Sequence, residues 1–306
     1  MTTTGSFRYL DPETIINSTV PFIKPWAKVD VNSTSYDQTS RTLPVTDIRS
    51  LPPASIGTDI TGFALHHHPT TATTDFTSDA SVRSTYYPEV ESLLRAKLPS
   101  IRRIVFFDHT IRKHDPSAPR QPVQSVHVDQ TPKAAETRVR RHVTDAEEAE
   151  ELLKGRYQII NVWRPISHPA TDFPLALVDW RTTEPKDLIA VDLLYPKRKD
   201  GEDDGDDRGK EALPDPETLK STNGYEIKGE TYGVVPSEKH KFYYVKDMTP
   251  EEALFIKCFD SRAEGQKGGK EGVAALTPHT AFIDPQTPTG TKGRESIEVR
   301  CLIFYN

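Results

Sequence analysis

A histidine and an aspartate separated by one residue lie near the middle of the chain, in the segment SVHVDQT. We expect a strand here from Gln124 to Asp129 that ends at Pro132. Because side chains alternate between the two faces of a strand, His127 and Asp129 would lie on one face and could bind one metal ion. A second histidine from a distant strand would complete a 2-His-1-carboxylate set. That set leaves three coordination positions open and is typical of non-heme Fe(II) oxygenases.

The C-terminal part of the chain offers the missing ligand and an anchor for a cosubstrate. His279 opens an expected strand, and Arg294 and Ser296 begin the next one. A 2-oxoacid that chelates iron needs a fixed cation for its far carboxylate, and a guanidinium offers two parallel hydrogen bonds. Ser296 lies on the same strand face and could donate a third. Arg300 also lies on that face, so either arginine is a candidate anchor, and the Arg-x-Ser context favours Arg294.

Four further residues are candidates for binding the cosubstrate or the substrate. Asn161 lies in an apolar strand, where a buried amide needs a partner. It could bind the cosubstrate carboxylate, or it could make a structural hydrogen bond inside the domain. Arg164, at the end of the same strand, is a candidate for substrate binding or for a surface ion pair. His109 and Tyr243 are further candidates for lining a pocket.

The remaining histidines are weaker candidates for metal binding. Three adjacent ones, at positions 66–68, cannot all face one ion from a strand, so we expect them at the surface. His240 stands between two lysines and is expected to be exposed.

Composition narrows the class of protein. The net charge of -6 argues against nucleic acid as the main partner. The two cysteines are expected to be reduced and buried, because a secreted protein of this size would usually carry more. Neither a signal peptide nor a membrane-spanning segment is visible, so we expect a cytoplasmic protein without a membrane partner. The sequence leaves a homo-oligomer open.

Closely spaced apolar segments predict a mainly β protein of antiparallel strands. Expected strands cover residues 101–110, 124–129, 157–165, 175–180, 188–195, 224–232, 241–245, 278–283 and 295–305. One helix, with Pro88 as its first residue, is expected within 82–98, and another is expected at 144–154. A third is expected at 249–259, where threonine, proline and glutamate form a helix-start pattern. We expect residues 1–60 to be an arm that wraps the core, and 61–306 to be one domain with a charged, mobile insertion near 196–212.

Several segments, in this order along the chain, resemble the mostly fungal hydroxylase/desaturase family, which includes gibberellin-desaturase-like and CmcJ-like proteins. They are VFFDHTIR (105–112), SVHVDQT (125–131), IINVWRP (159–165), DMTPEEALFIKCFDS (247–261) and residues 278–304. The resemblance implies a double-stranded β-helix, or jelly roll, that uses Fe(II), 2-oxoglutarate and O2 to hydroxylate or desaturate a small molecule of secondary metabolism. It places His127, Asp129 and His279 at the family's metal positions.

Another class stays open beside the oxygenase. Cupin-like jelly rolls also serve as metal-dependent isomerases or as ligand-binding modules without oxygenase activity. Binding of a metal without binding of 2-oxoglutarate would favour that class.

Overall fold

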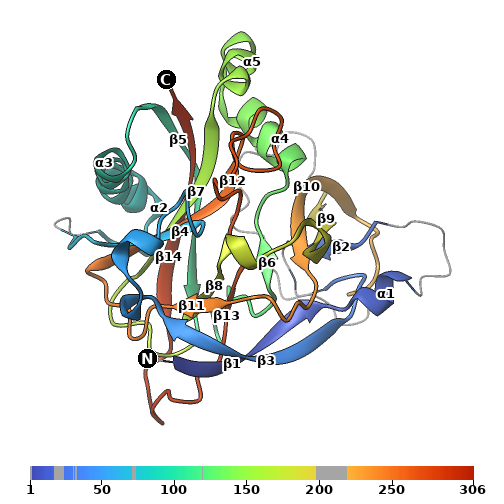
Figure 1. The fold of residues 1–306 in the computed structure, drawn as a ribbon, viewed down its shortest axis with the longest axis vertical. Helices are drawn as coiled ribbons and strands as arrows, with labels where there is room; N and C mark the ends of the chain where they lie inside the picture. The colour runs from blue at the N-terminus through green and yellow to red at the C-terminus, as the bar shows by residue number, and fades with distance from the viewer. Residues whose placement is uncertain are drawn as a thin grey trace.

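Two β-sheets face each other across an apolar core (Figure 1). The computed structural model describes residues 2–16, 24–29, 31, 33–70, 74–118, 120–197 and 219–306. Strand pairing is mainly antiparallel, with parallel pairs β11/β3 and β2/β9. The architecture is the jelly roll that was predicted.

The larger sheet has nine strands. In spatial order they are β1 (Thr2–Leu10), β3 (Gln38–Asp47), β11 (Phe242–Tyr244), β8 (Leu175–Val178), β13 (His279–Ala281), β6 (His127–Val128), β10 (Tyr225–Val234), β9 (Leu188–Pro196) and β2 (Trp26–Lys28). The smaller sheet has five strands. In spatial order they are β4 (Phe63–His67), β12 (Glu252–Asp260), β7 (Tyr157–Pro165), β14 (Glu295–Tyr305) and β5 (Ile101–Lys113).

Helices lie outside the sheets. The α-helices are α1 (Pro12–Ile16), α2 (Asp79–Ser81), α3 (Tyr87–Lys97), α4 (Pro132–His142) and α5 (Ala146–Lys154). The 3-10 helices are η1 (Ile48–Ser50), η2 (Pro53–Ser55), η4 (Trp180–Thr182) and η5 (Pro185–Asp187), and η3 (Val82–Tyr86) is a π-helix. The helix predicted within 82–98 corresponds to α3, and that at 144–154 to α5.

The smaller sheet is buried on both faces. Its inner face packs Trp163 and Leu254 against Leu177 of the larger sheet. Its outer face is covered by α3, whose Val90 and Leu93 lie in one cluster with β7 and β14 (Figure 1). Each such buried side chain contributes about 1.5–3 kcal/mol.

The predicted helix at 249–259 is wrong, because these residues form a turn followed by β12. One contact of a helix start is present, since Thr249 N–H donates to Glu252 Oε2 at 2.9 Å. From Ala253 onward, however, every residue to Asp260 is buried between β4 and β7. A continuous apolar run fits a strand that is covered on both faces. Tertiary burial here outweighs the local helix signal.

Helix α4 was not predicted, although its start carries a clear signal. Thr131 caps it, with its Oγ1 accepting from Ala134 N–H at 3.2 Å, and Pro132 occupies the first turn. β6 is only two residues long, shorter than the strand expected at 124–129. The cap of α5 is Asp145, which accepts from Glu148 N–H at 2.9 Å and lies one residue after the predicted start of this helix at 144.

The first 60 residues contribute strands β1, β2 and β3 to the larger sheet, and the division into an arm and a core domain stays a prediction. Most of the predicted charged insertion lies in 198–218, outside the described residues. Cys258 and Cys301 are free and buried, as predicted. Among the described residues, no helix has the length and apolar character needed to cross a bilayer.

Candidate metal centre and active site

Two neighbouring strands of the larger sheet bring two histidines side by side. His127 in β6 pairs directly with His279 in β13. Directly paired residues project to the same face of a sheet, and the two imidazole centroids are 4.5 Å apart. Residues far apart in the sequence therefore meet because β13 inserts between β8 and β6.

Asp129 completes the cluster from the segment that follows β6. Its Oδ1 lies 3.4 Å from His127 Nε2 and 3.9 Å from His279 Nε2. One potential ligand atom from each of the three residues lies within 4.8 Å of the other two. Such a cluster matches the span of three ligands around one ion.

Hydrogen bonds to the backbone orient both imidazoles. His127 Nδ1 lies 2.8 Å from the Ser125 carbonyl oxygen, and His279 Nδ1 lies 3.0 Å from that of Thr277. A carbonyl only accepts, so each Nδ1 carries the proton and each Nε2 presents a lone pair to the cluster. Metal-binding histidines are usually oriented in this way.

The second oxygen of Asp129 is already occupied. Its Oδ2 accepts from Asn161 Nδ2 at 2.7 Å and from Arg300 Nε at 3.2 Å. Burial would raise the pKa of Asp129, but Arg300 and the two histidines hold it well below its usual value. Asp129 is therefore ionised, with Oδ1 left for a single bond to a metal.

The pKa values of the two imidazoles shift in opposite directions. Burial lowers the pKa of His127, but the hydrogen bond and charge of Asp129 outweigh it, so that pKa is raised. The pKa of His279 is lowered, first by burial and then by the neighbouring His127.

Arg300 is held by carboxylates of the protein. Besides its bond to Asp129, its Nη1 donates to Asp108 Oδ1 at 2.8 Å and to Thr110 Oγ1 at 2.9 Å. Its Nη2 lies 2.7 Å from Glu298 Oε1. Although burial lowers the pKa of Arg300, these acids raise it well above its usual value. The guanidinium thus joins neighbouring strands and orients Asp129.

Arg294, unlike Arg300, has no ion pair with an acid among the described residues. It is 2% exposed, and its Nη1 donates to the Phe173 carbonyl at 2.6 Å. Its guanidinium lies 5.5 Å from the Trp163 ring centroid, and its Nε has no hydrogen-bond partner among the described residues. Burial, and then the charge of Arg112, lower the pKa of Arg294 to about 9. A buried cation with so little compensation is suited to receive an anion.

Sequence reasoning gave Arg112 no role. It pairs directly with Ser296 across β5 and β14, so both point to one face, and Ser296 is 1% exposed. Burial lowers the pKa of Arg112 to about 10. Strand β5 extends past the predicted end at residue 110 to Lys113. If the prediction had included this extension, the alternation of side chains would have placed Asp108, Thr110 and Arg112 on one face.

The structure does not bring Arg164 or His109 to this face. Arg164 follows Trp163 in β7, so its side chain points to the opposite face of the sheet. There its Nη1 donates to Oε1 of Glu89 in α3 at 2.9 Å. His109 pairs with Val299 on the helix-covered face, and its Nδ1 lies 2.9 Å from Tyr87 Oη.

Tyr243 does share the face of the metal cluster. It pairs with Leu177 from one side of β8, and His279 pairs with Leu177 from the other side.

Two expectations about other histidines have opposite outcomes. His67 is exposed and its neighbours His66 and His68 are partly exposed, as expected for residues 66–68. The expected exposure of His240 is wrong: it is 5% exposed and lies 3.0 Å from Tyr9 Oη and 3.3 Å from Asp187 Oδ2.

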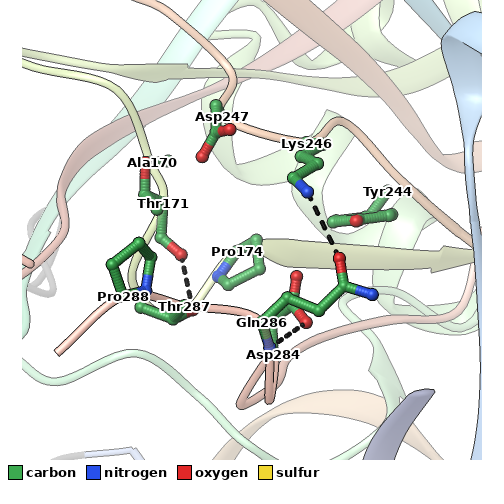
Figure 2. A pocket seen from close by; sticks show the side chains of 10 residues that line it. All are labelled: Ala170, Thr171, Pro174, Tyr244, Lys246, Asp247, Asp284, Gln286, Thr287 and Pro288. Carbon is green, nitrogen blue, oxygen red and sulfur yellow. Dashed lines mark hydrogen bonds between the residues drawn. The ribbon is translucent and has the colours of Figure 1, made fainter. Parts of the chain in front are cut away.

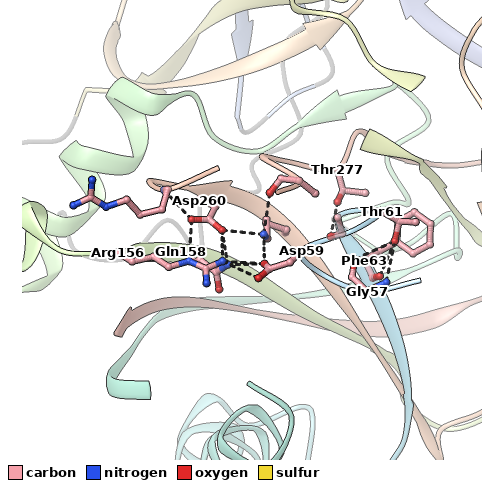
Figure 3. Close-up of polar contacts among 12 residues, drawn as sticks. Gly57, Asp59, Thr61, Phe63, Arg156, Gln158, Asp260 and Thr277 are labelled. Carbon is pink, nitrogen blue, oxygen red and sulfur yellow. Dashed lines mark hydrogen bonds and ion pairs between the residues drawn. The ribbon is translucent and has the colours of Figure 1, made fainter. Parts of the chain in front are cut away.

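A network of charges around the buried Lys257 fixes the segment that leads to His279 (Figure 3). Lys257 Nζ, fully buried, donates to Asp59 Oδ1 at 2.6 Å, to Asp260 Oδ2 at 2.9 Å and to the carbonyl of Ala274 at 2.9 Å.

Next to this network, Thr277 Oγ1 donates to the Gly62 carbonyl at 2.6 Å, while its own carbonyl accepts from His279. Gly62 has φ +92, and a Cβ there would lie 2.4 Å from Thr277 Oγ1, so this position requires glycine.

A cavity of about 180 Å³ lies away from the metal cluster, between residues 170–174 and 284–288 (Figure 2). Tyr244, Lys246 and Asp247 complete its lining, and none of His127, Asp129 and His279 contributes.

Two facing sheets that carry a His/Asp/His cluster on adjacent strands define a jelly-roll metalloprotein of the type to which non-heme Fe(II) oxygenases belong. Sequence comparison identifies the family. The chain belongs to the family described as "Oxidoreductase/YMDC permease-like domain", whose model matches residues 7–304.

Curated relatives from fungi confirm the predicted hydroxylase/desaturase family. The chain is 39% identical over 158 residues to the hydroxylase/desaturase AsaB of Aspergillus flavus. The aligned region covers 52% of this chain and 60% of AsaB. It is 33% identical over 234 residues to the hydroxylase/desaturase PoxK of Penicillium oxalicum, covering 75% of this chain and 68% of PoxK. The Fe(II)/2-oxoglutarate-dependent dioxygenase NvfI of Aspergillus novofumigatus is 30% identical over 227 residues, covering 74% of this chain and 68% of NvfI.

A solved structure has the same fold. The iron and alpha-ketoglutarate-dependent endoperoxidase NvfI superposes with a TM-score of 0.74 at 24% identity, covering 100% of this chain and 98% of the other. The predicted jelly roll is thereby confirmed at the level of the fold.

Proposed function

We propose that this chain is an Fe(II)/2-oxoglutarate-dependent oxygenase that hydroxylates or desaturates a small molecule of secondary metabolism. The observation that carries the proposal is that one ligand atom each of His127, Asp129 and His279 lies within 4.8 Å of the other two. The names of the fungal relatives support the same chemistry.

The donor set fits Fe(II). Two neutral imidazole nitrogens and one carboxylate oxygen would occupy three coordination positions and leave three for cosubstrate oxygens and O2. When bound, iron with 2-oxoglutarate and O2 supplies the oxidant that removes hydrogen from the substrate, with succinate and CO2 as coproducts. Asn161 and Arg300 would keep Asp129 bound through one oxygen, because both donate to the other.

Arg294 and Ser296 would hold the far carboxylate of 2-oxoglutarate. Arg300 has its hydrogen bonds to protein acids, whereas Arg294 Nε has no partner among the described residues. An incoming carboxylate would offset the cost of burying the Arg294 guanidinium, and Arg112 would add positive charge. Tyr243 remains the proposed substrate contact on this face. We further propose that the enzyme acts in the cytoplasm without nucleic acid or a membrane.

Succinate formation tests the proposal. The purified chain should form succinate from 2-oxoglutarate only when Fe(II) is present, even without substrate. Asp129→Ala and His279→Ala should abolish this activity, and His67→Ala, which removes an exposed histidine, should retain it. An Asp129→Ala protein that turns over at the wild-type rate would exclude the proposal. Metal binding without 2-oxoglutarate binding would instead favour a cupin-like isomerase or a ligand-binding jelly roll.

A further inference from the structure

The loop between β7 and β8 accepts two hydrogen bonds from Arg294. The backbone N–H of Arg294 donates to Asp172 Oδ2 at 3.2 Å. The guanidinium Nη1 of the same residue donates to the carbonyl of Phe173 at 2.6 Å. Two consecutive loop residues therefore fix both the main chain and the side chain of this arginine.

His114, just beyond the end of β5, contacts both Asp172 and the backbone carbonyl of Arg294. Its Nδ1 lies 2.6 Å from Asp172 Oδ2, and its backbone N–H donates to the Arg294 carbonyl at 2.8 Å. Its imidazole packs on the Phe173 ring with centroids 4.1 Å apart. Both backbone groups of Arg294 are thus engaged, and Asp172 joins the two sides.

The backbone around this arrangement is under constraint. Phe173 has φ +42, a left-handed conformation that is unfavourable for an aromatic residue. A Cβ at Gly293 would lie 2.1 Å from the His114 carbonyl oxygen, so the residue before Arg294 must be glycine. Such strain persists only where the surroundings impose it, and it is concentrated at sites that hold ligands.

We propose that His114, Asp172 and Phe173 form a clamp that positions Arg294 to receive the far carboxylate of a 2-oxoacid cosubstrate. The proposal rests on the function proposed above and adds three positioning residues to it. With Nη1 tied to the Phe173 carbonyl, the guanidinium plane is fixed, and its remaining N–H groups have a defined direction before the carboxylate arrives. Fixing a binding group in advance removes the entropy loss of ordering it on binding.

Two probes separate the clamp from general damage to the site. 2-Oxoglutarate and 2-oxopentanoate share the carboxylate and keto oxygens that chelate iron, but the second ends in a methyl group where the first carries its far carboxylate. The dissociation constants of both are measured by anaerobic calorimetry on the full chain loaded with Fe(II). The variants are Asp172→Ala and His114→Leu, and the control is Asp115→Ala, which removes an exposed carboxylate next to His114.

We expect both clamp variants to bind 2-oxoglutarate about ten- to a hundredfold more weakly, the range typical for loss of supporting contacts. Affinity for 2-oxopentanoate should stay within about twofold of wild type, and Asp115→Ala should change neither. Unchanged 2-oxoglutarate affinity, or an equal loss for both probes, would overturn the clamp. If Asp172→Ala does not fold, His114→Leu decides the matter, since this side chain is 40% exposed. A wild-type chain that binds no 2-oxoglutarate with Fe(II) would overturn the proposed function, and the clamp with it.

Discussion

Replacing Arg294 or Arg300 by methionine should change the stability of the metal-free protein in opposite directions. Arg300 lies in β14 and Arg294 directly precedes it, and the sequence alone left either as the cosubstrate anchor. Methionine keeps an unbranched side chain but removes the charge. The two positions differ in what surrounds the guanidinium.

At Arg294 the cost of burying the charge exceeds its compensation. Lowering its pKa from 12.5 to about 9 corresponds to about 5 kcal/mol. The bond to the Phe173 carbonyl returns about 1.5–3 kcal/mol, and the contact with Trp163 returns about 1 kcal/mol. Arg294→Met should therefore stabilise the metal-free protein by about 1–2.5 kcal/mol and raise its Tm by about 2–4 °C.

At Arg300 the balance is reversed. Its removal leaves Asp108, Asp129 and Glu298, which are largely shielded from solvent, beside one another without their cation. Removing one partner of a buried ion pair costs about 3–5 kcal/mol, which lowers Tm by on the order of 10 °C. Loss of its bond to Asp129 should also weaken metal binding by about 10- to 100-fold.

Thermal melts of the metal-free variants, followed by Mn(II) and 2-oxoglutarate titrations, check the whole pattern. Arg294→Met should bind the metal like wild type and lose 2-oxoglutarate affinity. Arg300→Met should lose metal affinity. If Arg294→Met is the less stable variant, or if Arg300→Met loses only 2-oxoglutarate, the assignment of the two arginines is refuted.

Three further outcomes are expected. Asn161→Leu, which removes the 2.7 Å hydrogen bond to Asp129, should weaken Mn(II) binding about tenfold, and an unchanged titration would contradict the role given to this amide. Lys257→Met should lower the free energy of unfolding in urea by about 3–5 kcal/mol, because it leaves Asp260 buried with one cation fewer; equal or greater stability would argue against the network. Burial would raise the pKa values of Asp59 and Asp260, but neighbouring cations lower both, so their contribution to stability is present above about pH 4 and is lost as the pH falls below it. Melts between pH 7 and pH 3 should show a smaller loss for Lys257→Met than for wild type, and identical slopes would count against this account.

Local patterns mislead where tertiary contacts compete with them. Thr131-Pro132 starts a helix, whereas Thr249-Pro250 precedes a strand, although both have the cap and proline of a helix start. A cap contributes only about 1 kcal/mol, less than the burial of a single large apolar side chain. β12 is buried on both faces between β4 and β7, so burial decides its conformation.

The sequence by itself determined much of the site. Alternation along a strand puts Arg294, Ser296 and Arg300 on one face, and the bounds of β7 and β14 follow directly from their apolar runs. The order of His-x-Asp, distal histidine and Arg-x-Ser predicted an oxygenase and left a cupin-like class open. Only the tertiary structure decided that β13 lies beside β6, that Arg300 is neutralised by Asp108 and Glu298, and that Arg164 faces α3. These features depend on strand order and on charges that are distant in sequence, and no local pattern encodes either of them.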